Sequence, residues 1–322
     1  MKCPICNSER VSIHLKDVPI VTLYKIKSKK LYTHYMCADC NTLFIYPIPN
    51  TKEFDSVYNN PEYYLSWERN LARNLQIRYG NDLKKYKVFI NKIPLNNHII
   101  DKPTRIIELG CALGHFLYWT MPHFTEVYGV EYSDYAIKHS INPNFRISKE
   151  FFNKFPANFF DVICSWDVFE HIPNIGEYIK ESYRILKPGG KLILTTPNSK
   201  SISFKIFKDK WIDIAPPEHV VIYSKDSLQL LFNKHSFKDV SIQCSSRFSL
   251  NPALPIYTII TKLFGTAPTN QMDKDYDKFR KRDTLSPFKK LIYSSYYMVA
   301  SIISWPINKL GYGDSLLLVA QK

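Results

Sequence analysis

The feature that most constrains this chain is an alternation of apolar and amphipathic stretches that begins at Thr104. Six stretches have the apolar pattern of strands: 105–110, 127–131, 159–166, 191–196, 240–244 and 314–321. Four stretches between them have helical spacing: 115–121, 133–140, 175–186 and 227–235. Parallel strands need helical crossovers, so this order is the signature of a parallel sheet. We therefore expect an α/β fold.

The rest of the chain falls into segments around this core. The first 50 residues are short β-prone pieces between two cysteine pairs, and apolar residues from 53 to about 93 recur every three or four positions. That spacing predicts a helix that Pro94 ends. We expect a small module at 1–50, a helical linker or cap at 51–100, the core at 101–250 and 313–322, and a helical insertion at 251–312.

A glycine-containing turn follows the first strand of the core. It reads Glu108–Leu109–Gly110–Cys111–Ala112–Leu113–Gly114–His115–Phe116 and opens a helix. Because glycine has no Cβ, Gly110 and Gly114 permit a sharp turn and close approach of a ligand. Such a turn lies at the carboxyl edge of a sheet, where α/β folds bind ligands. Alone it indicates a nucleotide site only weakly.

A second signal lies 17 residues beyond Gly114, where the second strand ends in Gly129–Val130–Glu131. A carboxylate at this point is placed to accept hydrogen bonds from both ribose hydroxyls of a nucleotide. The alternative is an acidic cap for the helix that begins near Ser133. The spacing from the glycine turn favours the ribose role.

Residues from about 104 to 250, with the last strand, resemble class I S-adenosylmethionine-dependent methyltransferases. The family's Glu/Asp-x-Gly-x-Gly-x-Gly turn stands here with Ala112 in place of the middle glycine. Residues 160–173, FDVICSWDVFEHIP, are similar to the family's fourth strand and the loop after it, and 186–194, LKPGGKLIL, to its turn into the fifth strand. No Gly-Lys-Ser/Thr follows the glycine turn, which excludes a P-loop.

The resemblance implies a Rossmann-like seven-stranded methyltransferase sheet and particular site residues. Glu108 and Gly110 would line the methionine end of S-adenosylmethionine, Glu131 the ribose, and Asp167 the loop beside the sulfonium. The full set of expected cofactor-binding residues is Glu108, Gly110, Cys111, Ala112, Gly114, Phe116, Glu131, Tyr132, Asp167 and Val168. Relatives often carry an acidic residue after the third strand for the adenine amine, and here Glu150 is the nearest candidate.

Two histidines are the candidate catalytic residues. His219, in a Pro-Glu-His-Val-Val stretch, matches a loop that faces the acceptor in this family, and a histidine there suits a general base. His171 follows Asp167-x-x-Glu170, which resembles the arrangement of quinone O-methyltransferases that bind a divalent cation. A structural histidine at a helix start is the alternative for His171.

Four N-terminal cysteines form two Cys-x-x-Cys pairs, Cys3 with Cys6 and Cys37 with Cys40. Two such knuckles bring four thiolates to a tetrahedral zinc ion, and a site closed by four cysteines is structural. A redox pair needs one knuckle in a βαβ setting. The stretch 37–64, which includes YPIP and YNNPEYY, resembles bacterial zinc-ribbon methyltransferases, many of which modify surface polysaccharides or sugars.

Composition and charge indicate the cellular compartment and the kinds of partner to expect. Apolar residues make up 45% of the chain and charged residues 22%, which is ordinary for a folded globular protein. We find no signal peptide, so we expect a cytoplasmic protein. The net charge is +14, and the positive residues flank a nearly neutral core, so phosphorylated molecules, anionic lipid or RNA are candidate partners. The alternative is a lysine-rich surface that favours solubility.

The predicted insertion has a sequence that could contact a membrane surface. Basic residues precede an uncharged run at 291–308 that Pro306 and several serines make a poor membrane span. These basic residues are Lys274, Lys278, Arg280, Lys281, Arg282, Lys289 and Lys290. Peripheral contact with the inner face of the membrane through 274–308 is one interpretation, and a lid or homodimer contact is the other. The membrane interpretation requires Tyr296, Ile303 and Trp305 to be exposed.

These features lead to one functional hypothesis and two rivals. The hypothesis is a methyltransferase that uses S-adenosylmethionine and zinc and O-methylates a sugar, glycan or lipid-linked cell-envelope precursor. The first rival is an RNA methyltransferase that uses the basic flanks and the zinc ribbon expected at 1–50, here called the ribbon. Against it, Lys25, Lys27, Lys29 and Lys30 lack an aromatic stacking motif. The second is a non-catalytic zinc-ribbon interaction protein, which the intact glycine turn and Glu131 argue against.

Overall fold

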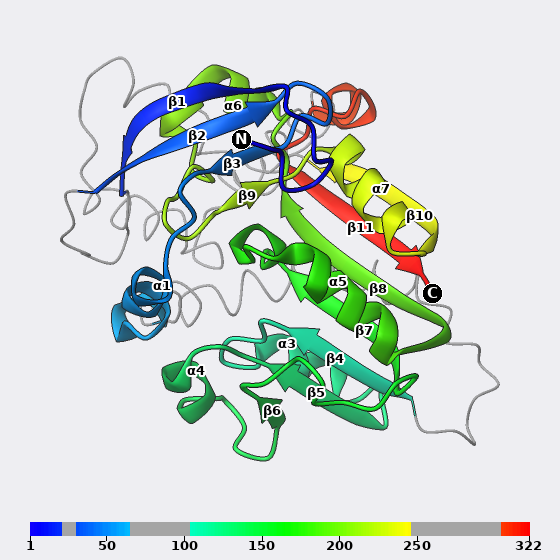
Figure 1. The fold of residues 1–322 in the computed structure, drawn as a ribbon. Helices are drawn as coiled ribbons and strands as arrows, with labels where there is room; N and C mark the ends of the chain where they lie inside the picture. The colour runs from blue at the N-terminus through cyan, green and yellow to red at the C-terminus, as the bar shows by residue number, and fades with distance from the viewer. Residues whose placement is uncertain (21–29, 65–103, 246–303) are drawn as a thin grey trace, which may run out of the picture.

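The computed structural model describes residues 1–20, 30–64, 104–245 and 304–322. Its core is a seven-stranded sheet in the order β10-β11-β8-β7-β4-β5-β6 (Figure 1). The strands are β4 (Arg105–Leu109), β5 (Glu126–Val130), β6 (Arg146–Ser148), β7 (Phe160–Trp166), β8 (Leu186–Pro197), β10 (Lys238–Ser245) and β11 (Ser315–Gln321). This mixed sheet confirms the expected methyltransferase architecture.

The direction of the strands changes at one side of the sheet. β6, β5, β4, β7 and β8 run parallel, and β11 is antiparallel to both β8 and β10. The parallel strands end at one edge, where the glycine turn after β4 and the loops after β5 and β7 meet. The antiparallel strand β11 is the last of the chain, as its apolar sequence predicted.

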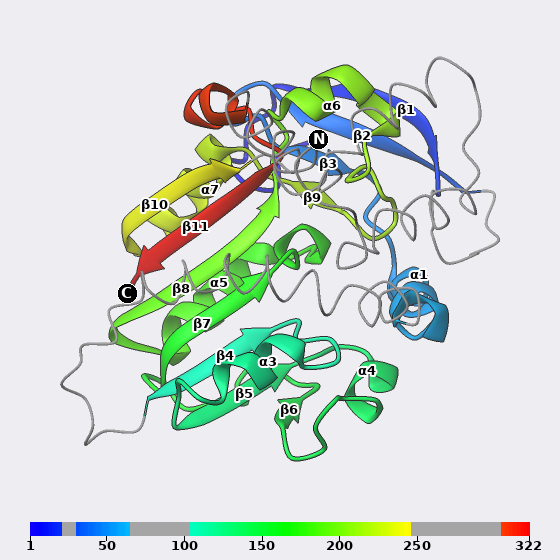
Figure 2. The same cartoon turned by 180° about the vertical axis from the view of Figure 1, so that it is seen from behind.

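Helices cover the two faces of the sheet. α5 (Ile175–Ile185) and α7 (Lys225–Lys234) lie on one face, and α3 (His115–Thr120) lies on the other (Figures 1 and 2). Alternate residues of each strand enter different cores: Ile107 and Ile163 pack with α5 and α7, whereas Ile106 and Val162 pack with Phe116 of α3. This two-residue period is the geometry of a strand buried on both faces.

The N-terminal ribbon forms a second sheet, of order β1-β2-β3-β9. Its strands are β1 (Val11–Pro19), β2 (Leu31–Cys37), β3 (Leu43–Ile45) and β9 (Val221–Ile222), all antiparallel. β9 follows the Pro-Glu-His loop of the core, so the core supplies one strand of the ribbon sheet. Side chains strengthen this junction, because Ser224 Oγ donates to the carbonyl of Cys40 at 2.6 Å.

The segment after the ribbon departs from the predicted long helix. α1 (Thr51–Tyr58) begins at a capping box made by Asn50 and Glu53 and ends at Asn59. A new helical turn starts at Pro61, because proline lacks the N–H that a continuing helix would need. The predicted helix from 53 to 93 is therefore interrupted at 59–60, and its part beyond 64 lies outside the described residues.

Some elements differ from the prediction, and some predicted segments lie outside the described residues. α4 (Asp134–Lys138) is shorter than expected, and α6 (Ile202–Phe207) was missed in the loop after β8. The insertion at 251–312 is described only from 304, where residues 304–309 are helical. Within the described residues, no helix is both long enough and apolar enough to cross a membrane.

Candidate active site

The glycine turn has the sharp backbone that its sequence predicted. Gly110 and Gly114 have φ values of +73° and +84°, and Ala112 between them also lies in the left-handed region, at +46°. The amides of Gly110 and Cys111 both donate to the carbonyl of Val130, which ties the turn to the end of β5. A Cβ added at Gly110 would lie 2.5 Å from Val168 Cγ2, so only glycine fits there.

Glu131 is buried just after β5, and its carboxylate accepts a hydrogen bond from the glycine turn. Its Oε2 accepts from the amide of Ala112 at 2.8 Å, and its Oε1 accepts from the amide of Ser133 at 2.9 Å and from the hydroxyl of Tyr64 at 3.2 Å. Burial raises the pKa of Glu131, and these donors oppose that rise by favouring the carboxylate. A buried acceptor therefore stands beside the glycine turn.

Glu108 is the second carboxyl group of this edge. It is 4% exposed, and its Oε2 has no hydrogen-bond partner among the described residues. Burial, and then the neighbouring charge of Glu131, raise its pKa well above the usual range. A buried polar atom without a partner is costly, so the arrangement suits a ligand that donates a hydrogen bond there.

The other predicted cofactor residues divide between the edge and the core. Asp167 has a left-handed backbone at the end of β7 and its Oδ1 accepts from Thr195 Oγ1 at 3.1 Å. Cys111 packs beneath the turn, and Tyr132 is partly exposed and donates to Asp55 of α1 at 2.6 Å. Phe116 is turned into the core, where its ring contacts Trp166.

Glu150, the candidate for the adenine amine, extends toward solvent. Its carboxylate lies 3.7 Å from the ammonium of Lys154, and its side chain is 77% exposed. No described contact links it to the glycine turn.

The structure brings His171 and His219 together. Their rings lie 4.7 Å apart between centroids and meet edge to face. His171 ends the short helix η1 (Phe169–His171) after β7, and His219 precedes β9. The amide of Val220 donates to the carbonyl of Glu170 at 2.8 Å, which joins the two segments.

A backbone carbonyl lies beside Nδ1 of each histidine. His171 Nδ1 lies 3.1 Å from the carbonyl of Glu218, and His219 Nδ1 lies 2.7 Å from the carbonyl of Asp213. A carbonyl can only accept, so we assign the proton of His219 to Nδ1, and its Nε2 then carries a lone pair. His171 Nδ1 also lies 2.8 Å from the hydroxyl of Tyr58, which can donate to it, so the carbonyl alone does not set the tautomer of His171. Burial, and then the nearby ring of His219, lower the pKa of His171 to about 3, so it stays neutral.

Buried carboxyl and phenol groups surround this pair. Glu170 Oε1 lies 4.0 Å from His171 Nε2, and Glu170 Oε2 accepts from Thr196. The hydroxyl of Tyr58, in α1, lies 2.8 Å from His171 Nδ1. Ligand atoms of Glu170, His171 and His219 lie within 4.8 Å of one another, which is also a donor set for a divalent cation. The arrangement can accept a proton or hold such a cation.

Three residues at this edge were not predicted from the sequence: Tyr58, Tyr64 and Glu218. The YNNPEYY stretch carries only a family resemblance, and Glu218 stands out only as the neighbour of His219. Tyr64 and Glu131 are 67 positions apart, and Tyr58 and His171 are 113 apart. No local pattern in the sequence could have paired them.

The four N-terminal cysteines also meet. Cys3 Sγ lies 3.5 Å from Cys40 Sγ, and Cys6 Sγ lies 3.6 Å from Cys37 Sγ. Four sulfurs bound at about 2.3 Å in a tetrahedron are roughly 3.8 Å apart, so the cluster has nearly the size that zinc requires. All four sulfurs lie within 4.8 Å of one another.

Comparison with known proteins agrees with this geometry. A family model described as a methyltransferase domain matches residues 73–242, more than half of the chain. The chain therefore belongs to this methyltransferase family, and its fold is that of the class I S-adenosylmethionine-dependent enzymes. A structure of phosphoethanolamine N-methyltransferase 2 from Haemonchus contortus, bound to phosphomonomethylethanolamine and S-adenosylhomocysteine, has the same fold. It is 16% identical, has a TM-score of 0.52, and covers 87% of this chain and 62% of its own.

Two curated relatives match the core at low identity. Phosphoethanolamine N-methyltransferase 3 of Arabidopsis thaliana is 27% identical over 179 residues, 50% of this chain and 35% of its own length. A ubiquinone biosynthesis O-methyltransferase of Pelagibacter ubique is 26% identical over 181 residues, 48% of this chain and 72% of its own length. This chain thus spans about a third of the Arabidopsis enzyme.

The buried carboxyl of Glu218 predicts a pH dependence of stability. Burial raises its pKa to about 8 from 4.5, so between these values the unfolded chain has lost a proton that the folded chain keeps. The free energy of unfolding should therefore fall as pH rises through this window, by up to about 1.4 kcal/mol per pH unit from this group. Glu218→Gln should remove this slope in urea unfolding from pH 5 to 8, while Glu177→Gln, at an exposed site, should keep it. Parallel curves for wild type and Glu218→Gln would contradict the assignment.

Proposed function

We propose that this protein transfers the methyl group of S-adenosylmethionine to a hydroxyl of a sugar, glycan or lipid-linked cell-envelope precursor. The observation that carries this proposal is the meeting of His171 and His219 at the carboxyl edge of a methyltransferase sheet. Sulfonium is a good leaving group, so such an enzyme mainly positions its reactants in line and removes a proton. His219 offers an Nε2 lone pair for that step, and His171 packs against its ring.

We assign the cofactor-binding roles of the family to the residues that lie at this edge of the sheet. Glu131 would accept from the ribose, and the unpartnered Oε2 of Glu108 would accept from the ammonium of the methionine end. Gly110 and Gly114 would let the backbone approach the donor, and Asp167 would border the sulfonium. Cys111, Ala112, Tyr132 and Val168 would line the same turn, while Phe116 would support it from the core.

The base assignment favours His219, with His171 as its partner. The proton of a bound hydroxyl would pass to Nε2 of one ring as the oxygen attacks the methyl carbon. The ring of His219 is held through Nδ1 by the carbonyl of Asp213, so it does not need to reorient before it accepts the proton. The phenol of Tyr58, whose pKa burial raises well above its usual range, stays protonated beside His171 and helps to fix that ring.

The choice of a glycan or lipid-linked acceptor rests on the ribbon and on an adjoining cavity. The ribbon resembles that of methyltransferases that modify surface polysaccharides. A mainly apolar cavity of about 540 Å³ lies where the ribbon meets the core, with Phe44, Ile45, Tyr46, Pro173 and Val220 among its lining residues. A lipid-linked or partly apolar acceptor would suit such a wall.

A nitrogen acceptor is the second candidate. The relatives from Arabidopsis and Haemonchus are named phosphoethanolamine N-methyltransferases, and an amine also has to lose a proton before or during methylation. The same histidine pair could take that proton. RNA has no comparable support from the site, although the basic flanks keep it among the acceptors to be tested.

Zinc is the second proposed cofactor. Cys3, Cys6, Cys37 and Cys40 would hold it in a closed structural site, and the spacing of their sulfurs fits that ion. Zinc bound there would cross-link the two knuckles of the ribbon and would take no part in the reaction.

The zinc proposal is tested by metal analysis. Purified reduced protein should contain one zinc per chain, and Cys37→Ser should lose it and lower the melting temperature, because structural zinc supplies folding free energy. Cys244→Ser, outside the ribbon, should keep the metal. Freshly prepared protein without zinc would contradict the proposal.

The cofactor assignment is tested at Glu131. Glu131→Ala removes hydrogen bonds to a charged acceptor, each worth about 1.5–3 kcal/mol, so the affinity for S-adenosylmethionine should fall tenfold or more. Glu177→Ala, on the exposed side of α5, serves as the control. Isothermal calorimetry that gives the same affinity for wild type and Glu131→Ala would refute the ribose role.

The acceptor is tested with labelled S-adenosylmethionine. Sugars, nucleotide sugars, lipid-linked sugar phosphates, phosphoethanolamine and RNA should be compared, and a hydroxyl of a sugar-containing acceptor should take the label. His219→Asn and His171→Asn should then lower kcat by about a hundredfold or more, since general-base catalysis contributes about that much. Labelling of phosphoethanolamine alone would replace O-methylation by N-methylation.

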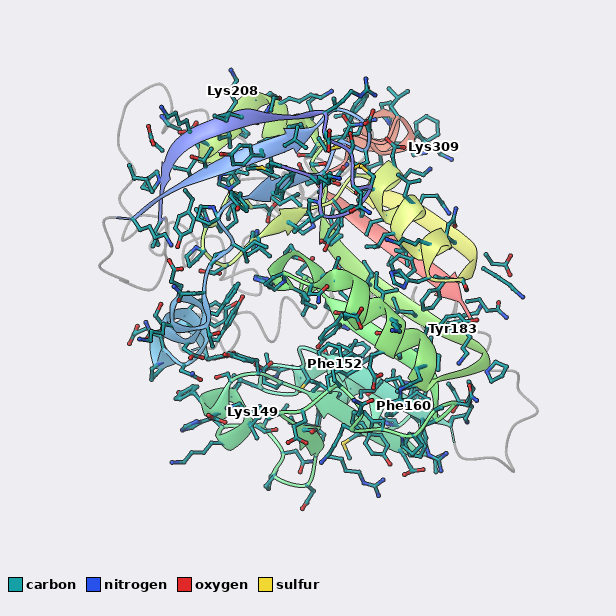
Figure 3. All side chains as sticks on the ribbon, viewed as in Figure 1. Lys149, Phe152, Phe160, Tyr183, Lys208 and Lys309 are labelled. Atoms are coloured by element: carbon teal, nitrogen blue, oxygen red, sulfur yellow. The ribbon has the colours of Figure 1, made fainter. Side chains whose placement is uncertain are left out.

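Peripheral contact with the membrane is a further part of the proposal. Trp305 is 65% exposed, Lys309 lies over its ring, and Figure 3 shows Lys208 and Lys309 on the edge that carries α6 and the 304–309 helix. Tyr296, Ile303 and the basic cluster at 274–290 lie outside the described residues. Lysines beside exposed apolar side chains suit an anionic membrane surface.

Flotation with liposomes tests this contact. The protein should float with vesicles that contain anionic lipid at low salt, and less at high salt, because the attraction is partly electrostatic. Trp305→Ser should weaken the binding, and neutral vesicles are the control. Absence from the floating fraction at low salt would leave the lid or homodimer contact as the role of the insertion.

A further inference from the structure

The carboxylate of Glu131 has no acceptor position left for a ribose. An ionised carboxylate accepts about four hydrogen bonds, two on each oxygen. The amides of Ala112, Tyr132 and Ser133 each provide one hydrogen bond to this carboxylate. The hydroxyl of Tyr64 provides the fourth. A ribose hydroxyl can therefore bind to Glu131 only if one of these four donors leaves.

Tyr64 is the donor that can leave. The three amides belong to the glycine turn and to the residues that lead into α4, and the backbone fixes both segments. The turn is bonded to the carbonyl of Val130, and Ser133 caps α4. The bond from Tyr64 is made by a side chain, and at 3.2 Å it is longer than the bonds of 2.8 and 2.9 Å from the amides of Ala112 and Ser133.

Tyr64 lies at the end of a segment that contacts both parts of the site. Residues 51–64, here called the strap, comprise α1 and the helical turn after it, and α1 lies between the ribbon and α4 (Figures 1 and 2). The hydroxyl of Tyr58 is 2.8 Å from His171 Nδ1, and Tyr132 donates to Asp55 at 2.6 Å. Among the described residues, side chains thus make the hydrogen bonds that join the strap to the core.

We propose that Tyr64 occupies the position of a ribose hydroxyl on Glu131, and that S-adenosylmethionine displaces it on binding. The phenol and the ribose are both hydroxyl donors to the same carboxylate, so the two contacts exclude each other. This inference rests on the proposed role of Glu131 at the ribose. It makes the strap an autoinhibitory contact that the methyl donor releases. Because Tyr58 of the same strap meets His171, the release is linked to the acceptor side of the site.

Such an exchange gives the hydroxyl of Tyr64 opposite effects on stability and on affinity. Its hydrogen bond to a buried carboxylate stabilises the protein before the cofactor binds, and that bond has to be broken when the ribose takes its place. The ring itself stacks on Tyr135 and packs with Leu113 and Ala136. Phenylalanine at position 64 keeps this packing and removes only the competing donor.

Calorimetry on the full chain with S-adenosylhomocysteine and its 2′-deoxy and 3′-deoxy analogues tests this inference. Tyr64→Phe should bind S-adenosylhomocysteine about three- to tenfold more tightly than wild type, because no hydrogen bond has to be broken first. Its melting temperature without ligand should be lower. The gain in affinity should vanish for the analogue that lacks the hydroxyl which replaces Tyr64. The matched control Tyr135→Phe, which keeps the stacked ring, should bind all three ligands as wild type does.

The other outcomes overturn the inference or the proposed function separately. Unchanged or weaker binding of S-adenosylhomocysteine by Tyr64→Phe would mean that the phenol does not compete with the ribose. An equal gain for all three ligands would mean that Tyr64 obstructs the site without holding a ribose position. A measurement on wild type avoids the variant: the NMR signal of Tyr64 Cζ should shift when S-adenosylhomocysteine binds, and an unshifted signal would contradict the displacement. If Glu131→Ala leaves the affinity unchanged, the ribose assignment itself fails.

Discussion

The pairing of β3 with β9 is the constraint on which the rest of this structure depends. Leu43 and Phe44 pair with Ile222 and Val221, so the last strand of the ribbon sheet comes from the loop that also carries His219. The amide of Ile45 donates to the carbonyl of Val220, whose own amide donates to Glu170. A short chain of backbone hydrogen bonds thus runs from the ribbon to both histidines. The ribbon and the histidine pair therefore belong to one structural unit.

Burial of ionisable groups is what makes this edge chemically distinctive. Glu108, Glu131, Glu170 and Glu218 are all buried, and each has a raised pKa because the charged form loses its hydration. His171 is shifted the other way for the same reason. Such opposed shifts in one place are costly to stability and are concentrated at functional sites. The fold accepts this cost next to the glycine turn and the histidine pair.

The sequence predicted the parts of this structure that depend on short-range pattern. The strand positions, the glycine turn with Gly110 and Gly114 at positive φ, and the meeting of the two cysteine pairs all follow from local spacing. The sequence could not predict the pairing of β9 with the ribbon or the contacts of Tyr58 and Tyr64, because these contacts join segments that only the tertiary fold brings together. The long predicted helix after residue 53 shows the opposite failure: apolar periodicity outweighed the Asn-Asn-Pro signal at 59–61 that ends α1.

The central claim is that the edge around Glu131 and His171 binds the methyl donor with its sulfonium toward the histidines. A crystal structure of the full chain with S-adenosylhomocysteine tests this most directly. The account predicts a ribose within hydrogen-bond distance of Glu131 and a sulfur atom that faces the space beside His171 and His219. A ligand bound elsewhere on the sheet, or one whose sulfur points away from the two histidines, would contradict it.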